Sequence, residues 1–515
     1  MRKINLNILM GVAFLSLCNV SCDGFLDKNP LISVSDDIFW NNEEDVKIAL
    51  AGVYSRLQEN FMGYERVYYD ALSDNAFPDP GNSNQANIGS LTIGGISPGL
   101  GGAMVNMYST PYKLVSSVNY FLDNIDKANL GESRGNNYKA EARFLRALAY
   151  FELVQQFGGV VIYRNFVSEL QDVRIPKSSI EEVYEFIYED LDFAIQHLSN
   201  EKYNGHAVKA SAQGIKARAL MVQNKWTEAI PLLREIINDN KHGLADDYAS
   251  IFTTNGQAKD NINKEILFST CYLAPNNVHR LRPGAGGLDI ELGWYALMQP
   301  YQNLVNAYGM KDGKSISESS LYDSEKPYEN RDPRLYATVK LPTDVWRNPN
   351  TNAVVPIYNT YTGFHTKKYV DLNRLPFTNA TAAMSDQDYI HLRYADILLM
   401  LAEALNESAG PSIEAYDLVD QIRGRKSVNL PAIDKTKYST QSALREQIRN
   451  ERRVEFALEG HRYHDLKRWK IAHEVLPKLS SPSGIPYVFE QHNYYLPFTI
   501  TELDNNPNLI QNEGY

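Results

Sequence analysis

The segment from Tyr138 to Phe157 constrains the fold more than any other part of the sequence. Its apolar residues recur at steps of three and four: Ala140, Phe144, Ala147, Leu148, Phe151 and Val154. This spacing is typical of an amphipathic α-helix with one buried face. Gly158 and Gly159 follow directly, and glycine commonly ends helices. The segment therefore predicts a long helix.

The same periodicity recurs along the chain. Single helices are predicted at Asp45 to Leu57, at Tyr112 to Ile125 and at Ile180 to Leu198. With a chain of 515 residues, these patterns predict a mostly α-helical protein with two lobes or one elaborate helical domain.

Two segments have the pattern of helical hairpins. Ala207 to Asn238 is one, and Ala217 and Ala229 lie twelve residues apart in it. The tetratricopeptide pattern places small residues at that separation, because paired helices approach closely there. A second hairpin is predicted from Asp396 to Glu407 and from Ile413 to Arg425. Repeated pairs indicate a scaffold of tetratricopeptide-like helices.

Between Asn255 and Asp388 the helical pattern fades, and Pro, Gly, Asn and Tyr become frequent. Short strands are predicted at Glu265 to Thr270 and at Thr338 to Leu341. A Gly/Pro/Asn-rich loop is predicted from Phe77 to Gly102. We therefore expect an irregular, loop-rich lobe on the helical scaffold, and loops on rigid scaffolds are where binding residues concentrate.

The first residues have the features of an export signal. Arg2 and Lys3 precede an apolar run from Ile8 to Leu17, which is too short to span a bilayer as a helix. Cys22 follows small and apolar residues, so we predict a lipoprotein signal peptide over residues 1–21 and lipidation of Cys22. The alternative is an ordinary secretory signal.

Cysteine content fits this interpretation. After cleavage before Cys22, the only other cysteine is Cys271. The mature chain would then form no internal disulfide and no cysteine-based metal site. The acyl chains would be the membrane anchor.

Composition and motifs disfavour several functional classes. The net charge of −11 disfavours nucleic acid as a partner. The sequence contains no GxSxG or HExxH motif and no phosphate-binding glycine loop. His461 and His464 have a possible metal spacing, but a structural role is favoured. The segment from Asp386 to Asp388 could hold a hard cation, yet it lacks the spacing of a calcium loop. We predict no enzyme activity, metal or cofactor.

Three C-terminal segments and the N-terminal part carry a resemblance to one family. The C-terminal segments are Ile390 to Glu407, Ile448 to Trp469 and Tyr495 to Tyr515. The N-terminal motifs are CDGFLDKNP, SVSDDIFWNNEEDVKIALAGVY and RALAYFELVQQFGGVV. Taken from the N-terminus to the C-terminus, these motifs resemble the SusD/RagB family over essentially the whole mature chain.

The resemblance implies a SusD-like fold, in which four tetratricopeptide-like pairs support an irregular lobe that carries the ligand site. It also implies a non-enzymatic, surface-exposed lipoprotein of the outer membrane that sits over a SusC-like TonB-dependent barrel. We expect residues 22–260 to form the N-terminal part with the helical scaffold. Residues 261–515 would form the C-terminal part with the binding lobe.

Charged and aromatic residues in these motifs have the character of structural groups. Glu451, Arg452, Arg453 and Glu455 are expected to pair along and between helices. Ion pairs are predicted between Arg393 and Asp396 and between Arg462 and Asp465. Trp40, Trp226 and Trp469 are assigned to the core. The tail NPNLIQNEGY has no helical period, so we expect it to dock onto the body.

A sugar site needs flat aromatic faces flanked by amides, carboxylates or arginine. Two loop-rich regions offer this combination, and the family draws its sites from the same regions. The predicted ligand contacts are Tyr64, Tyr68, Asp74, Asn106, Trp294, Tyr295, Tyr301 and Trp346. A structural role for Asp74 is the alternative.

The leading hypothesis is a lipoprotein that binds an oligo- or polysaccharide and delivers it to a SusC-like transporter. A binder of peptides or another non-sugar nutrient on the same scaffold is the alternative. A surface glycoside hydrolase and a purely structural tetratricopeptide scaffold are less favoured.

Overall fold

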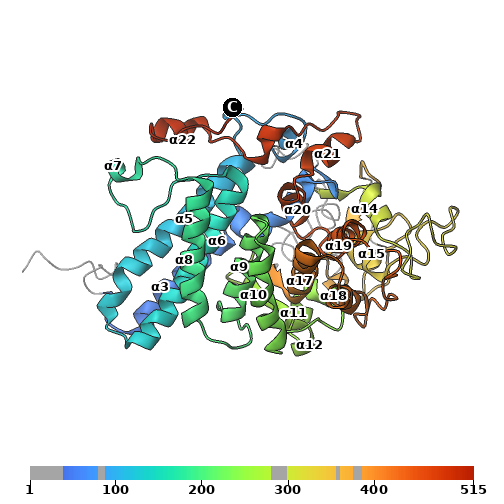
Figure 1. Ribbon diagram of the computed structural model, residues 1–515, viewed down its shortest axis with the longest axis horizontal. Coiled ribbons are helices and arrows are strands. Elements are labelled where there is room, and N and C mark those ends of the chain that lie inside the picture. The colour runs from blue at the N-terminus through green and yellow to red at the C-terminus, as the bar shows by residue number, and fades with distance from the viewer. Residues whose placement is uncertain (1–38, 79–86, 280–297, 355–359, 375–385) are drawn as a thin grey trace, which may run out of the picture.

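The computed structural model describes residues 39–78, 87–279, 298–354, 360–374 and 386–515. Helices dominate it. In Figure 1, α5, α6 and α8 stand together in the N-terminal half, α9 and α10 lie in the middle, and α17 to α19 lie in the C-terminal half. The C-terminal segment crosses above these helices, and an irregular lobe lies at the far end (Figure 1).

Nine helices of the described ranges have eleven or more residues. They are α3 (Glu43–Ser55), α5 (Ala103–Asn124), α6 (Glu132–Phe157), α8 (Ile180–His197), α9 (Lys209–Val222), α10 (Trp226–Asn238), α17 (Tyr394–Ala409), α18 (Ile413–Arg423) and α19 (Gln441–Glu455). Shorter α-helices are α4 (Asn87–Thr92), α7 (Leu170–Val173), α11 (Thr254–Gln257), α12 (Asp260–Asn263), α14 (Gln302–Ala307), α15 (Pro333–Thr338), α20 (Arg462–Arg468), α21 (Ala472–Val475) and α22 (Ile500–Asn505). Turns of 3₁₀-helix occur at Arg56–Gln58, Asn60–Met62, Tyr64–Leu72, Ile125–Ala128, Ala249–Phe252, Leu372–Arg374, Leu476–Lys478 and Gln491–Tyr494.

Local sequence explains where several helices begin and end. The Ser179 hydroxyl and the Glu182 carboxylate form a capping box at the start of α8. Asn42 accepts two backbone N–H groups at the start of α3. Gly158 ends α6 with a positive φ of 70°, a conformation that glycine adopts without strain.

The predicted single helices and hairpins are present, with one clear correction. The helix predicted from Tyr112 begins at Ala103, nine residues earlier, so that Pro111 lies inside α5. Proline removes a backbone donor and usually ends a helical pattern. Here the first turns are retained because Met104 and Met107 are buried in the core. In the hairpin of α9 and α10, Ala217 and Ala229 are both fully buried.

The described strands form three two-stranded antiparallel sheets. β1 (Ala76–Pro78) pairs with β3 (Met298–Pro300), β2 (Ile266–Thr270) with β6 (Tyr389–Arg393), and β4 (Val339–Lys340) with β5 (His365–Thr366). The two strands predicted from sequence are β2 and β4. The loop predicted from Phe77 to Gly102 is partly wrong, because it includes the end of β1 and the helix α4.

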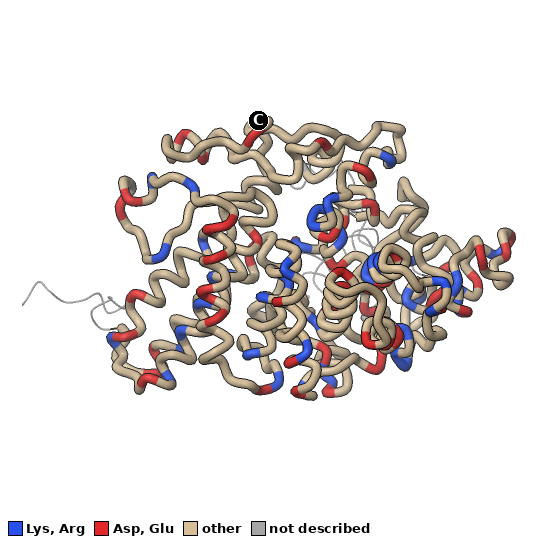
Figure 2. The backbone as a smooth tube through the Cα atoms, in the orientation of Figure 1, with Lys and Arg blue, Asp and Glu red and all other residues tan. Residues whose placement is uncertain are grey.

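A buried network of charges joins the C-terminal helices to the lobe. Its members are Glu265, Arg334, Arg393, Arg425, Glu455 and Glu459. Arg393 contacts the carboxylates of Glu265 (2.8 Å), Glu455 (2.7 Å) and Glu459 (2.8 Å). Burial would raise the pKa of Glu455, but the neighbouring guanidinium groups outweigh it and hold that pKa well below its usual value. In the C-terminal half, positions of both charge signs lie interspersed along the chain (Figure 2).

The two ion pairs predicted within the C-terminal motifs are wrong. Asp396 contacts Arg218 (2.5 Å) and Arg452 (2.6 Å) instead of Arg393. Asp465 contacts Arg452 (3.2 Å) and Arg468 (2.7 Å) instead of Arg462. Arg393 and Arg462 instead turn toward acidic groups on other elements, whereas Asp465 does pair along its own helix, but with Arg468.

The C-terminal tail docks onto the body as expected. The Asn512 amide donates to the carbonyls of Phe157 (2.8 Å) and Leu496 (2.7 Å), and Leu509 is buried. Of the three tryptophans assigned to the core, Trp40 is buried and Trp226 packs half-buried against the core. The assignment of Trp469 is wrong, because this half-buried ring donates to Glu403 (2.7 Å) and lies against arginine side chains.

Candidate functional site

Four aromatic residues gather where the irregular lobe meets β1. We call Phe77, Tyr301, Tyr361 and Tyr487 the aromatic platform. Phe77 lies in β1, and Tyr301 directly follows β3, its antiparallel partner. The pairing of Phe77 with Gln299 fixes the register. The Gln299 side chain then accepts the Tyr361 backbone N–H at 2.9 Å, which attaches the segment of Tyr361.

The platform has one ring that is mainly in solvent. Tyr361 is 69% exposed, and its ring meets Phe77 edge to face at 6.0 Å between centroids. Phe77 also contacts Tyr301, with 6.4 Å between their ring centroids. The hydroxyls of Tyr301 and Tyr487 share a hydrogen bond of 2.6 Å. The buried Phe77 ring therefore contacts both the exposed Tyr361 ring and Tyr301, whose hydroxyl is fixed by its bond to Tyr487.

Asp74 holds the platform from beneath. Its carboxylate contacts Arg462 (2.8 Å) and Arg453 (3.1 Å), and only 4% of the residue is exposed. Arg453 also donates to the Asn75 side chain (2.9 Å), and the Asn75 carbonyl accepts the Tyr301 N–H (2.9 Å). Burial would raise the pKa of Asp74, but the two arginines outweigh it and hold the pKa below its usual value.

Of the residues predicted to contact ligand, Tyr301 belongs to the platform and Asp74 lies beneath it. Tyr64 is buried, donates to Gln387 (2.7 Å) and stacks on His279 with 4.1 Å between ring centroids. Tyr68 is also buried. The structure therefore does not bring Tyr64 and Tyr68 to the platform, and their contact with ligand stays a prediction.

The remaining predicted contacts are separated. Asn106 is half-buried in the first turn of α5, and Trp346 is buried in the lobe near the bridge between Arg347 and Val354. Trp294, Tyr295 and the lipidation candidate Cys22 lie outside the described residues.

Sequence reasoning missed Phe77, Tyr361 and Tyr487 as members of one group. Tyr361 stands in a tyrosine-rich stretch, YNTYTGF, which was a usable signal. Phe77 and Tyr487 had none, because only the fold brings their segments together.

The platform has the chemistry of a binding surface. An aromatic face can cover the apolar face of a sugar ring, and tyrosine hydroxyls can bond its hydroxyl groups. In the described part of the chain, no three His, Cys, Asp or Glu side chains gather as a metal site would require. Within the same ranges, no helix has the length and apolarity needed to cross a membrane.

Comparison with known proteins places this architecture in a family. The SusD family model matches residues 250–515, and a family described as starch-binding and associating with the outer membrane matches residues 24–221. A SusD-like protein of Formosa agariphila is 26% identical over 552 aligned residues, which cover 99% of each chain.

Two solved structures from Bacteroides fragilis have the same fold. A SusD-like protein superposes with a TM-score of 0.80 at 27% identity, covering 95% of this chain and 100% of its own. A SusD-like carbohydrate-binding protein superposes with a TM-score of 0.78 at 25% identity, covering 92% and 100%. The predicted mostly α, SusD-like fold is confirmed. Because the SusD family model alone matches more than half of the chain, this protein belongs to the SusD/RagB family.

Proposed function

We propose that this protein captures a glycan on its aromatic platform and does not cleave it. The observation that carries the proposal is Tyr361, an exposed ring held edge-on by buried Phe77. The Tyr361 backbone is anchored to Gln299, so the chain that carries the ring needs little ordering when a sugar stacks on it. Membership of a family that includes carbohydrate-binding proteins supports the same ligand class.

The proposal extends to delivery. We infer that the chain is exported with residues 1–21 as signal peptide and lipidated at Cys22 on the outer surface of the outer membrane. Residues 22–260 would supply the helical scaffold and residues 261–515 the binding lobe. A SusC-like TonB-dependent barrel would receive the glycan. Support comes from the sequence resemblance and from the outer-membrane association in the description of the matching family.

Affinity electrophoresis against plant, host and microbial polysaccharides tests the binding proposal. We expect one glycan class to retard the protein. Tyr361→Ala should abolish the retardation, whereas Tyr361→Phe, which keeps the ring, should retain most of it. Tyr322→Ala is the matched control, because Tyr322 is also an exposed tyrosine of the lobe, at 37%.

Three outcomes would contradict the proposal. Equal retardation of the Tyr361→Ala and Tyr322→Ala variants would show that the platform is not the site. Release of reducing ends from the polysaccharide by the pure protein would show an enzyme. Binding of peptides, with no retardation by any polysaccharide, would favour the alternative nutrient class.

A further inference from the structure

A second cavity lies in the helical half, and it satisfies the same chemical criterion for a sugar site. It has a volume of about 540 Å³ and opens between α5, the segment 163–173 and α22. We call it the tyrosine cavity, because Tyr108, Tyr112 and Tyr163 line it. Figure 1 shows α7 and α22 at one end of the molecule, while α14, next to the platform, lies toward the other.

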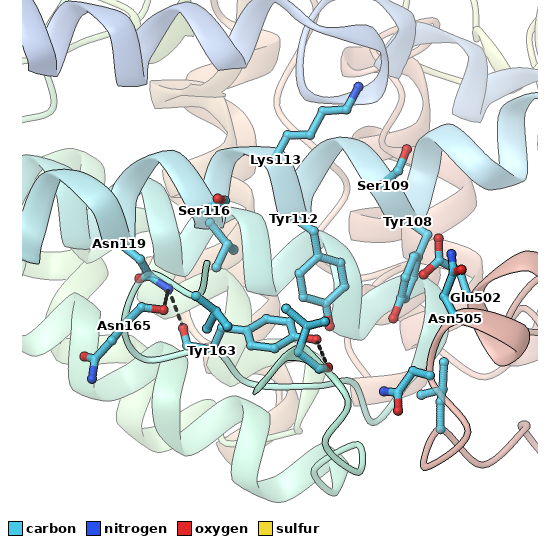
Figure 3. Close-up of a pocket in the computed structure, with 15 residues that line it drawn as sticks. Tyr108, Ser109, Tyr112, Lys113, Ser116, Asn119, Tyr163, Asn165, Glu502 and Asn505 are labelled. Atoms are coloured by element: carbon cyan, nitrogen blue, oxygen red, sulfur yellow. Dashed lines mark hydrogen bonds between the residues drawn. The ribbon is translucent and has the colours of Figure 1, made fainter. Parts of the chain in front are cut away.

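Hydrogen bonds fix the walls of the tyrosine cavity. The Tyr112 hydroxyl donates to the Val161 carbonyl (2.8 Å), and the Tyr163 hydroxyl donates to the Val173 carbonyl (2.7 Å). The Asn119 amide donates to the carbonyls of Tyr163 (2.8 Å) and Asn165 (2.9 Å), as Figure 3 shows. The rings and the loop are therefore held in place without a ligand.

The C-terminal segment closes the other side. Arg174 donates to the Asn505 carbonyl (3.0 Å), and the Asn506 amide donates to the Ile175 carbonyl (2.9 Å). These two contacts tie α22 and the residue after it to the end of the loop segment. The cavity is thus preformed from three parts of the chain, which lowers the ordering cost of binding.

Three polar side chains at the cavity remain available. Within the described ranges, the side chains of Asn165, Glu502 and Asn505 have no hydrogen bond or ion pair to protein. Figure 3 shows Asn165 at one end of the row of tyrosines and Glu502 with Asn505 at the other. Burial raises the pKa of Glu502, as expected for a carboxylate with no cation beside it. The cavity therefore offers bonding groups at both ends of an aromatic wall.

The fixed charges disfavour an acidic ligand. Lys113 borders the cavity, but it pairs with Glu59 (3.6 Å) and points away from the tyrosine rings in Figure 3. Glu502 therefore leaves the cavity negative. The amides of Asn165 and Asn505, one at each end of the cavity, can each donate and accept hydrogen bonds, as sugar hydroxyls require. A cationic ligand would use only the oxygen acceptors.

We propose that the tyrosine cavity is a second binding site for a short uncharged oligosaccharide, separate from the aromatic platform. This inference rests on the proposed function, since it assumes that the ligand of the protein is a glycan. Tyr112 and Tyr163 supply the wall, and Glu502 and Asn165 accept hydroxyl hydrogen bonds at its two ends.

The test uses the full chain in detergent and titration calorimetry with malto-, laminari-, cello-, xylo- and chitohexaose as probes. Tyr361→Ala first removes the platform. At least one hexasaccharide should still bind this variant at one site. Adding Ser116→Trp, which places a bulky ring at an exposed cavity position, should abolish that binding. Ile413→Trp adds the same ring at a distant exposed position and is the matched control, so it should leave hexasaccharide binding by the Tyr361→Ala variant unchanged.

A milder variant guards against misfolding. Glu502→Gln keeps the shape of the side chain and should weaken the residual binding by about tenfold, because the sugar hydroxyl then bonds a neutral amide oxygen in place of a charged carboxylate. Hydrogen exchange should slow in segment 163–173 when the probe binds. Unchanged affinity in Glu502→Gln, or no protection of this segment, would overturn the second site.

The two proposals fail separately. Loss of all binding in Tyr361→Ala, with Ser116→Trp alone unchanged, would overturn the tyrosine cavity and leave the platform as the site. Binding that is lost in Ser116→Trp but kept in full in Tyr361→Ala would overturn the platform and leave the tyrosine cavity as the site. Spermidine binding at the cavity, with no hexasaccharide bound at millimolar concentration, would also overturn the inference.

Discussion

The sequence predicts that Asp74 contacts the ligand, whereas the structure gives it a supporting role. Replacement of Asp74 by asparagine distinguishes these two roles. The carboxylate is buried between Arg453 and Arg462, whose side chains are 12% and 11% exposed. Breaking a buried pair costs about 3–5 kcal/mol, because a charge is left without its partner. Arg453 keeps its bond to Asn75, and asparagine can still accept one hydrogen bond. We therefore expect a loss of about 3 kcal/mol, at the lower end of this range.

Urea unfolding of Asp74→Asn measures this loss as a change in the free energy of unfolding. Glu414→Gln is the control, because Glu414 makes a comparable bidentate contact with Arg234 (2.9 and 2.6 Å) but both side chains are over 40% exposed. Exposed pairs contribute about 0–1 kcal/mol. Calorimetry on the folded Asp74→Asn protein should show glycan affinity within about threefold of the wild type, a difference of roughly 0.6 kcal/mol.

The contribution of Asp74 to the free energy of unfolding depends on pH in one direction. The pKa of Asp74 is lower in the folded state than its ordinary value of 3.8. Its stabilising contribution is therefore complete above that value and is lost as the pH falls through the lowered pKa. The reasoning is refuted if Asp74→Asn unfolds like the wild type but no longer binds glycan, because Asp74 would then contact the ligand.

Three further predictions follow from buried groups and from the N-terminus. Glu455→Gln should cost about 3–5 kcal/mol in urea unfolding, since Glu455 neutralises several buried arginines; a loss below about 1 kcal/mol would contradict the network. Burial lowers the pKa of Lys467 to about 7 in the folded protein. Above that pH the unfolded state binds more protons than the folded state, so the free energy of unfolding of the wild type should rise by about 2 kcal/mol from pH 7 to 9. Lys467→Met should remove that rise, and a parallel pH profile in both proteins would refute it. Cys22→Ser should move the protein from the membrane to the soluble fraction of cells, as membrane fractionation would show.

The helices could be predicted because their signal is local. In the segment from Tyr138 to Phe157, the apolar period and the terminal Gly158 are both written in consecutive residues. The start of α5 was missed for the opposite reason. Pro111 is a local signal against a helix, and the buried Met104 and Met107 that override it depend on contacts with other elements.

The ion pairs show where local reasoning ends. Arg393 and Asp396 are three residues apart and look like partners on one helix. In the fold Arg393 ends a strand and points toward Glu265, Glu455 and Glu459, while Asp396 faces Arg452. Which charge meets which depends on helix packing, and that is not encoded in nearby residues.

The same limit applies to the platform. Its rings come from β1, from the end of β3, from the segment before β5 and from the C-terminal region. The pattern of aromatic residues near polar ones indicates Tyr301, but it equally indicates Tyr64, Tyr68 and Trp346, which the fold buries. Composition identifies suitable residue types, and only tertiary contacts decide which rings reach the surface.

The platform separates the residues that hold it from the residue that would touch a ligand. Asp74 and its arginines are buried and charged, so their replacement costs stability. Tyr361 is mostly in solvent, and its replacement removes little packing. Ligand preference could therefore change through Tyr361 and its exposed neighbours while Asp74 continues to fix the segments beneath. Under the proposed function, replacing the ring at position 361 would therefore change ligand preference more than stability, whereas replacing Asp74 would do the opposite.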